Sequence, residues 1–262
     1  MKKHIFSFLA FVLTLSVFVV PVCASQSAEC LSWYIKKQGR NTPLFPKEAE
    51  EIKQYDAYYI DEKCLNSEEG KRIYITFDAG YENGNIEKIL DTLKKENVPA
   101  AFFLLDNIIL KNPELVKRMS DEGHLVCNHT RNHKNLSSCS SEEISDNLRS
   151  LEKIYEEQTG EKMSKYFRFP EGSYSISSLS TIQSLGYKTI FWSFGYEDWD
   201  NNRQMSEEKA MKKILQNTHN GEVLLLHPTS ETNARILPSL IQAWRGLGYS
   251  FGTLDELVSE ES

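Results

Sequence analysis

The chain has 262 residues, which is enough for one large domain or two small ones. It carries a formal net charge of -7 and no block of basic residues, so we expect no nucleic acid among its partners. Aromatic residues make up 11% of the chain, a content that suits sugar-stacking surfaces and ordinary cores equally well.

The first 24 residues have the features of a signal peptide. A short basic head precedes an almost unbroken apolar run over 5–20, and Val22-Cys23-Ala24 has the small-residue character of a cleavage site before Ser25. An uncleaved membrane anchor is one alternative, although the run is slightly short for a span. A lipoprotein anchored at Cys23 is another, which the large Val22 disfavours. We therefore predict export to the outside of the cytoplasmic membrane.

Residues 25–70 form a predicted N-terminal extension to a main domain that covers 71–262. Within the extension, Pro46 begins a predicted helix that reaches Tyr55, because proline suits the first turn of a helix. The polar stretch 66–71 is predicted to be the linker between the two parts.

From Arg72 onward, β-like runs alternate with amphipathic helical patterns about seven times, with short connections. This alternation implies parallel strands covered by helices. The number of strands favours a barrel over an open sheet, although alternation alone does not separate the two. The predicted strands are 72–77, 100–105, 124–127, 166–168, 187–194, 223–226 and 249–252. The predicted helices are 85–96, 113–122, 140–160, 175–186, 206–217 and 232–247.

Five residues capable of chemistry follow β-like runs of this domain: Asp78, His129, Arg168, Asp198 and His227. The carboxyl ends of parallel strands meet at one edge of a sheet, where α/β proteins keep their catalytic groups. Two acids and three basic or metal-binding groups, with no Ser or Cys nucleophile, therefore predict one polar site. The alternative is that these are five unrelated loop residues.

His129 and His133 lie four residues apart, directly after the predicted strand 124–127. On a helical turn, two imidazoles at this spacing lie on one face and can share a metal ion. Pairs of this kind are often incidental surface residues, but the position directly after a strand favours the metal interpretation.

Five short motifs carry these residues in order: Thr-Phe-Asp-x-Gly, His-Thr-x-x-His, Arg-x-Pro-x-Gly, Asp-Trp and Leu-Leu-x-His. From about Arg72 to Thr253, the set resembles the motifs of the polysaccharide deacetylases, the NodB-homology group called carbohydrate esterase family 4. The form Thr-Phe-Asp-x-Gly-Tyr-Glu-Asn-Gly and the stretch Tyr55-Asp56-Ala57-Tyr58-Tyr59 are similar to one subgroup. That subgroup is the δ-lactam-biosynthetic muramic acid deacetylases of endospore-forming bacteria.

The resemblance implies a distorted (β/α) barrel of about seven strands, the NodB type, with a short N-terminal extension. It also implies metal-assisted hydrolysis of an N-acetyl amide, in which Asp78 is the general base and His227 the general acid. Arg168 would pair with the base and keep it ionised, and Asp198 would favour the protonated form of the acid. For Arg168 alone, a surface salt bridge is the alternative.

The same resemblance makes His129 and His133 ligands of a divalent metal, with Zn²⁺ as the first choice. The backbone N–H of Glu171, next to Gly172, would stabilise the oxyanion, a task that does not depend on the side chain. Trp199 would pack beside the acid or line the sugar groove, and core packing is the alternative for this residue taken alone.

The sequence departs from the family at two places. Most members carry a second Asp after the base as the third metal ligand, whereas this chain has Ala79. Two His ligands and water make a weaker site, so we expect low metal affinity unless a nearby group such as Glu82 or Asn83 substitutes. The third motif also has Phe169 and Glu171 where Pro and an aromatic residue are usual, which bears on the shape of the substrate groove.

The subgroup resemblance implies that the substrate is N-acetylmuramic acid in spore-cortex peptidoglycan, where N-acetylmuramoyl-L-alanine amidase has already removed the stem peptide. The freed amine would then close to muramic-δ-lactam, in the forespore intermembrane space or the cell wall. The nearest alternative is a deacetylase of N-acetylglucosamine in peptidoglycan or chitin. Another is a non-catalytic glycan-binding relative, against which the retention of both Asp78 and His227 argues.

Overall fold

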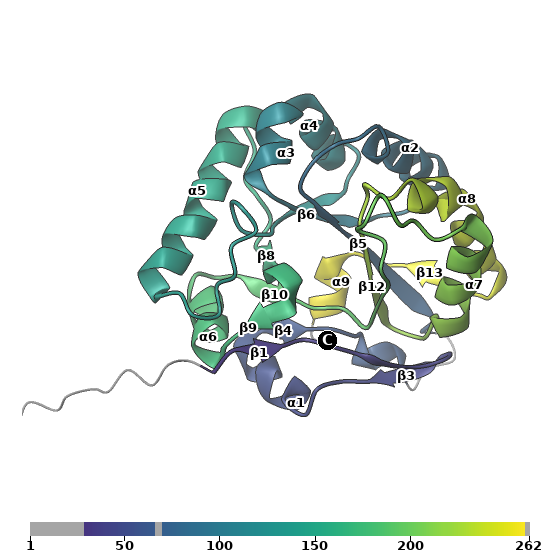
Figure 1. Ribbon diagram of the computed structural model, residues 1–262, viewed down its shortest axis with the longest axis horizontal. Helices are drawn as coiled ribbons and strands as arrows, with labels where there is room; N and C mark the ends of the chain where they lie inside the picture. Colours follow the sequence, from purple (N-terminus) through teal and green to yellow (C-terminus); the bar gives the residue numbers. More distant parts are fainter. Residues whose placement is uncertain (1–28, 66–69, 260–262) are drawn as a thin grey trace, which may run out of the picture.

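A curved parallel sheet forms the centre of the molecule, and the computed structural model describes residues 29–65 and 70–259 (Figure 1). The sheet has nine strands, of which eight follow the order β11-β12-β5-β6-β7-β8-β10-β4, while β13 pairs with β5. All of these pairings are parallel, and the predicted distorted (β/α) barrel is confirmed. The strands are β4 (Ala57–Tyr58), β5 (Arg72–Ala79), β6 (Ala101–Leu104), β7 (Leu125–Asn128), β8 (Tyr166–Phe167), β10 (Lys188–Ile190), β11 (Phe194–Gly195), β12 (Glu222–Leu226) and β13 (Ser250–Phe251).

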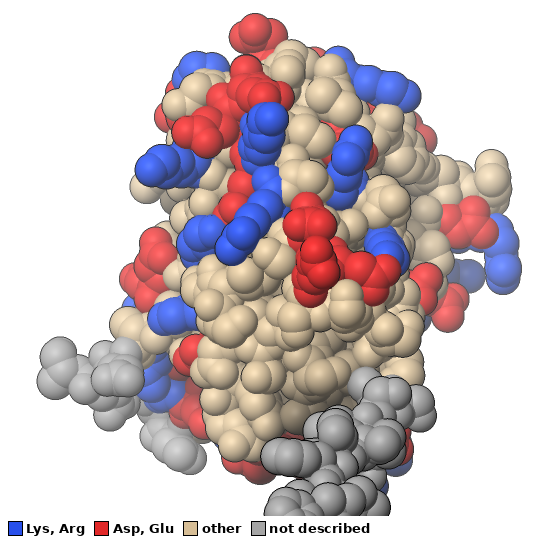
Figure 2. Space-filling view, turned by 90° about the vertical axis from the view of Figure 1, so that its left-hand side faces the viewer, with Lys and Arg blue, Asp and Glu red and all other residues tan. Residues whose placement is uncertain are grey.

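Helices surround the sheet, with α5 and α6 on one side of Figure 1 and α7 and α8 on the other. On the side where α5 lies, acidic and basic side chains are interspersed over the upper part of the face (Figure 2). Six helices match the predicted ranges closely: α2 (Ile86–Glu96), α4 (Pro113–Asp121), α5 (Ser141–Thr159), α6 (Ile176–Ser184), α7 (Glu207–Asn217) and α8 (Glu231–Gly246). Three further short helices are α1 (Ala49–Ile52), α3 (Asp106–Lys111) and α9 (Leu254–Val258).

The prediction of one strand over 187–194 is wrong, because this run divides into β10 and β11. Phe191 N–H donates to Tyr58 O of β4 at 2.8 Å, whereas Ser193 N–H donates to Val223 O of β12 at 2.9 Å. The chain thus passes from one edge of the sheet to the other within a few residues. This division, together with β4 from the extension, accounts for nine strands where the sequence predicted about seven.

The segment before the linker closes the open edge of the sheet. Ile60 forms an isolated antiparallel bridge with Glu222 at the start of β12. Asp61 N–H donates to Gly221 O at 2.9 Å. A Cβ on Gly221 would lie 2.3 Å from Asp61 O, so only glycine allows this close approach. The extension is therefore packed into the barrel and contributes a strand to its sheet.

The remaining elements of the extension lie along one side of the barrel (Figure 1). The predicted helix from Pro46 to Tyr55 is present as α1 followed by a 3₁₀ turn, η1 (Lys53–Tyr55). The predicted signal peptide over 1–24 lies outside the described residues. Within 29–65 and 70–259, no helix combines the length and the apolar character needed to cross a membrane. The other short elements are β1 (Leu31–Ser32), which pairs with β9 (Ser173–Tyr174), the hairpin of β2 (Lys36–Gln38) and β3 (Asn41–Leu44), and the turns η2 (Glu62–Cys64) and η3 (Pro170–Gly172).

Side chains of the strands divide between an outer layer beneath the helices and the barrel interior, because successive residues of a strand point to opposite faces. On β5, Ile73, Ile75 and Phe77 belong to the outer cluster, whereas Tyr74 belongs to an inner one. Residues of α9 complete this inner cluster, which fills the interior around the starts of the strands. By the same alternation Asp78 faces the interior, at the carboxyl end that α9 does not fill.

A buried acid marks the junction between the extension and the barrel. Glu222 is 0% exposed, and its Oε2 accepts a hydrogen bond from the backbone N–H of His219 at 3.1 Å. Its Oε1 finds no partner within the described part of the chain. Burial raises the pKa of Glu222 to about 8, although the His219 N–H opposes this shift. The carboxyl group is therefore mostly protonated at neutral pH.

We expect Glu222→Gln to remove part of the pH dependence of stability. The folded state holds the proton up to about pH 8, whereas the unfolded chain releases it near the ordinary value of 4.5, so Glu222 lowers stability as pH rises between these values. The substitution should raise the free energy of unfolding by roughly 2 kcal/mol at pH 8 and much less at pH 5. Urea unfolding at both pH values measures this, and an equal effect at both would contradict it.

Candidate active site

The carboxyl ends of six strands, β5, β7, β8, β10, β11 and β12, open onto one cavity of about 540 Å³. The predicted residues Arg168 and Asp198 do not line it but lie directly behind, hydrogen-bonded to residues that do. The structure brings the other predicted residues that line the cavity together, and it adds two residues that the sequence did not indicate, Trp192 and Leu225. The lining residues are Asp78, His129, His133, Glu171, Trp192, Trp199, Leu225 and His227.

Asp78 is held by a fully buried arginine. Arg168 Nη1 donates to Asp78 Oδ1 at 2.8 Å, and Arg168 itself is 0% exposed. Its Nε donates to Ile190 O at 2.9 Å, and the guanidinium lies 4.2 Å from the ring centre of Phe103. Burial alone would raise the pKa of Asp78, but the guanidinium and two nearby imidazoles lower it below its ordinary value. Asp78 is thus ionised at neutral pH, and the pair is no surface salt bridge.

His129 is oriented by the same strand that carries the arginine. Its Nδ1 lies 2.8 Å from Arg168 O. Because a carbonyl oxygen can only accept a hydrogen bond, the proton of the ring resides on Nδ1. The lone pair of Nε2 then faces the cavity, 3.6 Å from Asp78 Oδ2. Burial lowers the pKa of His129 to about 4, which keeps the ring neutral. A neutral, oriented imidazole is the form that binds metal ions.

The turn carrying both histidines is not helical, so the predicted helical geometry is wrong. Thr130 and His133 have φ angles of 69° and 59°, in the left-handed region. Asn128 Oδ1 accepts the Thr130 N–H at 2.9 Å and fixes the start of the loop. The loop still brings the rings of His129 and His133 together, with centres 5.1 Å apart. Side-chain proximity therefore arises from loop folding and not from the helical period.

Two imidazoles side by side are suitable donors for a divalent cation. Within 29–65 and 70–259, no group of three or more His, Cys, Asp or Glu side chains is placed to share a metal ion. Ala79 is 1% exposed and offers no donor atom. The chain thus fits a metal through His129 and His133, with the remaining ligands left to water and substrate.

The two residues considered as substitute ligands are engaged elsewhere. The Glu82 carboxylate accepts the backbone N–H groups of Gly84 and Ile86 and so caps the start of α2. Asn83 Nδ2 donates to Thr229 O at 2.8 Å. Neither side chain lines the cavity.

His227, at the end of the neighbouring strand β12, is held by a second acid. Its Nδ1 lies 2.7 Å from Asp198 Oδ1, and its backbone N–H donates to Asp198 Oδ2 at 2.8 Å. Asn233 Nδ2 donates to the same oxygen at 2.6 Å. Burial alone would lower the pKa of His227, but Asp198 raises it above its ordinary value. Asn233 was missed because a polar residue early in α8 carries no sequence signal for this contact.

Trp199 forms an exposed wall beside this pair. It is 57% exposed, and its ring centre lies 5.8 Å from that of His227 at an angle of 68°. Core packing, the alternative considered from the sequence, therefore does not apply to Trp199. The position next to the cavity matches the predicted sugar groove.

A strained turn forms the remaining wall. Glu171 and Gly172 have φ angles of 58° and 66°, and the Gly172 N–H donates to Phe169 O at 3.1 Å. Because the Gly172 N–H is already engaged, the Glu171 N–H is the group of this turn that remains as the predicted oxyanion donor. A Cβ on Gly172 would lie 2.9 Å from Trp192 and 3.0 Å from Trp33, so glycine is required there.

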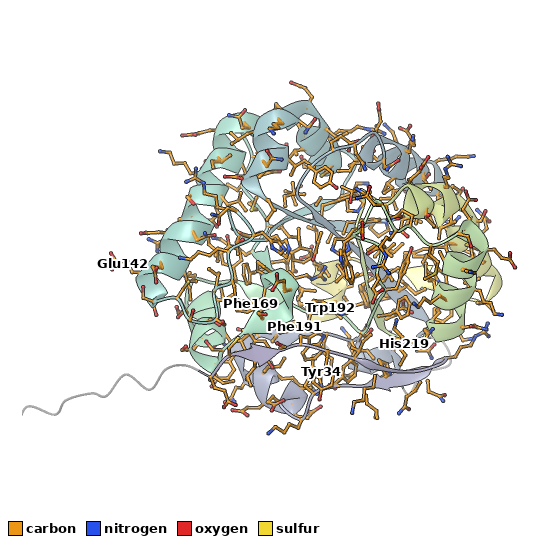
Figure 3. All side chains as sticks on the ribbon, viewed as in Figure 1. Tyr34, Glu142, Phe169, Phe191, Trp192 and His219 are labelled. Atoms are coloured by element: carbon orange, nitrogen blue, oxygen red, sulfur yellow. The ribbon has the colours of Figure 1, made fainter. Side chains whose placement is uncertain are left out.

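Trp33 of the extension supports both this turn and Trp192. Its backbone N–H donates to Gly172 O at 2.8 Å, and its Nε1 donates to Trp192 O at 2.9 Å. Its ring stacks on Phe191 with centres 4.6 Å apart. In Figure 3, Phe191 and Trp192 lie above the extension segment that carries Tyr34. No sequence signal marks this role, since the contacts span more than a hundred residues.

The chain is similar to known proteins over most of its length. Residues 66–190 match the family model described as polysaccharide deacetylase. The peptidoglycan-N-acetylmuramic acid deacetylase PdaA of Bacillus subtilis (strain 168) is 36% identical over 237 residues, 89% of this chain and 88% of that protein. The solved structure of Bacillus subtilis PdaA, a family 4 carbohydrate esterase, has a TM-score of 0.82 at 36% identity, covering 87% of this chain and 97% of that one.

Two further relatives differ in what their names state. A peptidoglycan-N-acetylglucosamine deacetylase of Bacillus cereus is 32% identical over 209 residues, 76% of this chain and 93% of that protein. A family 4 pseudoenzyme from Bacillus anthracis has a TM-score of 0.66 at 28% identity, covering 72% of this chain and 66% of that one.

A parallel barrel whose strand ends bring a paired carboxylate, a paired imidazole and two adjacent imidazoles to one cavity defines a hydrolase site of the NodB type. The chain belongs to the polysaccharide deacetylases, carbohydrate esterase family 4, and the resemblance seen in its motifs is confirmed. Deacetylases of this family are generally metal-dependent.

We expect Trp33→Phe to lower the kcat of deacetylation about fivefold. The variant loses the hydrogen bond to Trp192 O, and with it about 1 kcal/mol of the energy that holds Trp192 in the cavity wall. KM should change less, since no substrate contact is removed. Steady-state acetate release measures both constants. The matched control is Tyr34→Phe, which alters an exposed neighbour. Equal kinetics for the two variants would contradict the supporting role of Trp33.

Proposed function

We propose that this protein is an exported peptidoglycan N-deacetylase in which Asp78 is the general base and His227 the general acid. The observation that carries this proposal is that both side chains line one cavity while each is held in the required protonation state by its own partner. Hydrolysis of an amide needs an ionised base for water and a protonated acid for the departing amine. Because β5 and β12 are neighbours, the two groups approach the substrate from adjacent strands.

In the proposed reaction, Asp78 takes a proton from water as the water oxygen attacks the acetyl carbonyl carbon. Arg168 keeps the carboxylate ionised and aimed. The Glu171 N–H donates a hydrogen bond to the carbonyl oxygen and so stabilises the negative charge that develops there. His227 then gives its proton to the amide nitrogen, the C–N bond breaks, and acetate and a free amine result.

A divalent cation bound by His129 and His133 would supply Lewis-acid chemistry, polarising the acetyl oxygen and lowering the pKa of water. Zn²⁺ is the proposed ion, since imidazole nitrogens suit it. The oriented Nε2 of His129 supports this assignment. With Ala79 in place of a third protein ligand, the proposed affinity is low.

We propose N-acetylmuramic acid as the sugar that is deacetylated, supported by the similarity to PdaA of Bacillus subtilis. The further proposals follow from the subgroup resemblance: prior removal of the stem peptide by an amidase, closure to muramic-δ-lactam in the spore cortex, and export through a signal peptide over 1–24. The similarity to the Bacillus cereus enzyme supports N-acetylglucosamine as the second candidate sugar. Muropeptide mass spectrometry of a deletion strain separates the two, because unchanged δ-lactam levels would reject muramic acid.

The proposed acid–base chemistry predicts the loss of acetate release in two single variants. We expect Asp78→Asn and His227→Ala each to lower kcat about a hundredfold or more on amidase-treated glycan, because each removes one proton-transfer group. A chelator should also lower the rate of the unsubstituted enzyme. Leu110→Ala, on an exposed helix position, is the matched control. Activity that survives both substitutions would defeat the mechanism and favour a glycan-binding protein.

The two-histidine site predicts a gain of metal affinity in Ala79→Asp. A third protein ligand should strengthen Zn²⁺ binding by about tenfold or more, as measured by isothermal titration calorimetry. His133→Ala is the matched control and should weaken binding in both backgrounds. Unchanged affinity in a folded Ala79→Asp protein would contradict the prediction and would agree with the place of Ala79 in the apolar cluster beneath the helices.

A further inference from the structure

Tyr81 is a large aromatic residue that the proposed chemistry does not use. It lies three residues after Asp78, in the segment 80–85 between β5 and α2, and it is 46% exposed. It does not line the catalytic cavity. An exposed aromatic ring this close to the carboxylate of Asp78, at the carboxyl edge of the barrel, is a candidate contact for a ligand or a structural partner.

The segment that carries Tyr81 is fixed by hydrogen bonds at several points. Asn83 Nδ2 donates to Thr229 O at 2.8 Å, and Glu82 Oε2 accepts the Ile86 N–H at 3.1 Å. The hydroxyl of Tyr81 itself accepts a hydrogen bond from Asn201 Nδ2 at 2.6 Å. The ring is therefore held at its polar end while its apolar part stays open to solvent, which lowers the entropy cost of binding a ligand.

The bond between Tyr81 and Asn201 joins this segment to the loop after β11. That loop also carries Trp199, two residues before Asn201 and 57% exposed beside His227. Tyr81 and Trp199 are two of the five most exposed large hydrophobic residues in the described part of the chain. Two exposed rings therefore stand on two loops that this hydrogen bond joins, and one of the rings, Trp199, lines the catalytic cavity.

We propose that Tyr81 and Trp199 form an aromatic binding surface for a second sugar of the glycan strand, next to the sugar whose acetyl group enters the cavity. This inference rests on the proposed function. Aromatic rings pack against the apolar C–H faces of pyranose rings, and Tyr and Trp suit surfaces that are partly apolar and partly wet. A polymeric glycan is the fitting occupant because Trp199 lines the cavity that receives one sugar of the strand, and the Tyr81–Asn201 hydrogen bond joins the second ring to the same loop.

The surface predicts that recognition depends on chain length. Peptide-free glycan fragments of two and six sugars are the probes, and the readout is the ratio of their kcat/KM values. In Tyr81→Ala we expect the long-over-short ratio to fall about three- to tenfold, the loss expected for one aromatic contact. In Tyr81→Phe, which keeps the ring and loses only the hydroxyl, most of the ratio should remain.

Leu44→Ala is the matched control, since Leu44 is 53% exposed on the β2–β3 hairpin and outside the cavity lining. An unchanged ratio in folded Tyr81→Ala, or an equal fall in Leu44→Ala, would overturn the proposal. An equal fall in Tyr81→Phe would assign the effect to the hydroxyl and likewise reject ring stacking.

Dissociation constants of the same fragments, measured on the Asp78→Asn background, test the surface independently of turnover. A fall in the long-over-short affinity ratio on adding Tyr81→Ala supports the surface even if the unsubstituted enzyme releases no acetate, in which case the proposed function fails alone. Acetate release without any effect of Tyr81→Ala on either ratio overturns the surface alone.

Discussion

The site depends on one buried ion pair. Arg168 is 0% exposed, and a guanidinium cannot lose its charge, so its burial requires an opposite charge and full hydrogen bonding. Asp78 supplies the charge, and the carbonyls of Ile190 and Phe191 accept the remaining donors. The carbonyl of Arg168 in turn orients His129. One side chain and its backbone thus position the proposed base, the imidazole of His129 and the edge where the sheet divides.

The extension contributes to this arrangement through packing. Between β10 and β11 the chain crosses from one sheet edge to the other, and the rings of Phe191 and Trp192 occupy the crossing. Trp33 stacks on the first and holds the carbonyl of the second, while Ile60 bridges to β12. Residues before the linker therefore act as the inner support of the cavity wall, and the catalytic barrel and its extension form one packed unit.

The sequence predicted what local periodicity encodes. The alternation on β5 and the strand-end positions sufficed to place Asp78, Arg168 and His227 at one edge, because parallel strands share their direction. It did not predict the division of 187–194, since all of those residues suit a strand and the break is decided by hydrogen bonds to Tyr58 and Val223. The roles of Trp33 and Asn233 depend likewise on contacts between distant segments, which a single sequence does not record.

Ala79 separates two requirements that most members of the family satisfy together. The acid–base pair needs only charges: Arg168 favours the ionised form of Asp78, Asp198 favours the protonated form of His227, and neither effect requires a donor at position 79. Metal affinity does need donors, and here the chain supplies two imidazoles. A protein without catalysis would gain nothing from burying two charged pairs around one cavity, because apolar residues of similar volume in their place would avoid the desolvation of charge. Substitution by apolar residues would be the less costly end state. The presence of both pairs around one cavity therefore argues for hydrolysis and not for a binding relic.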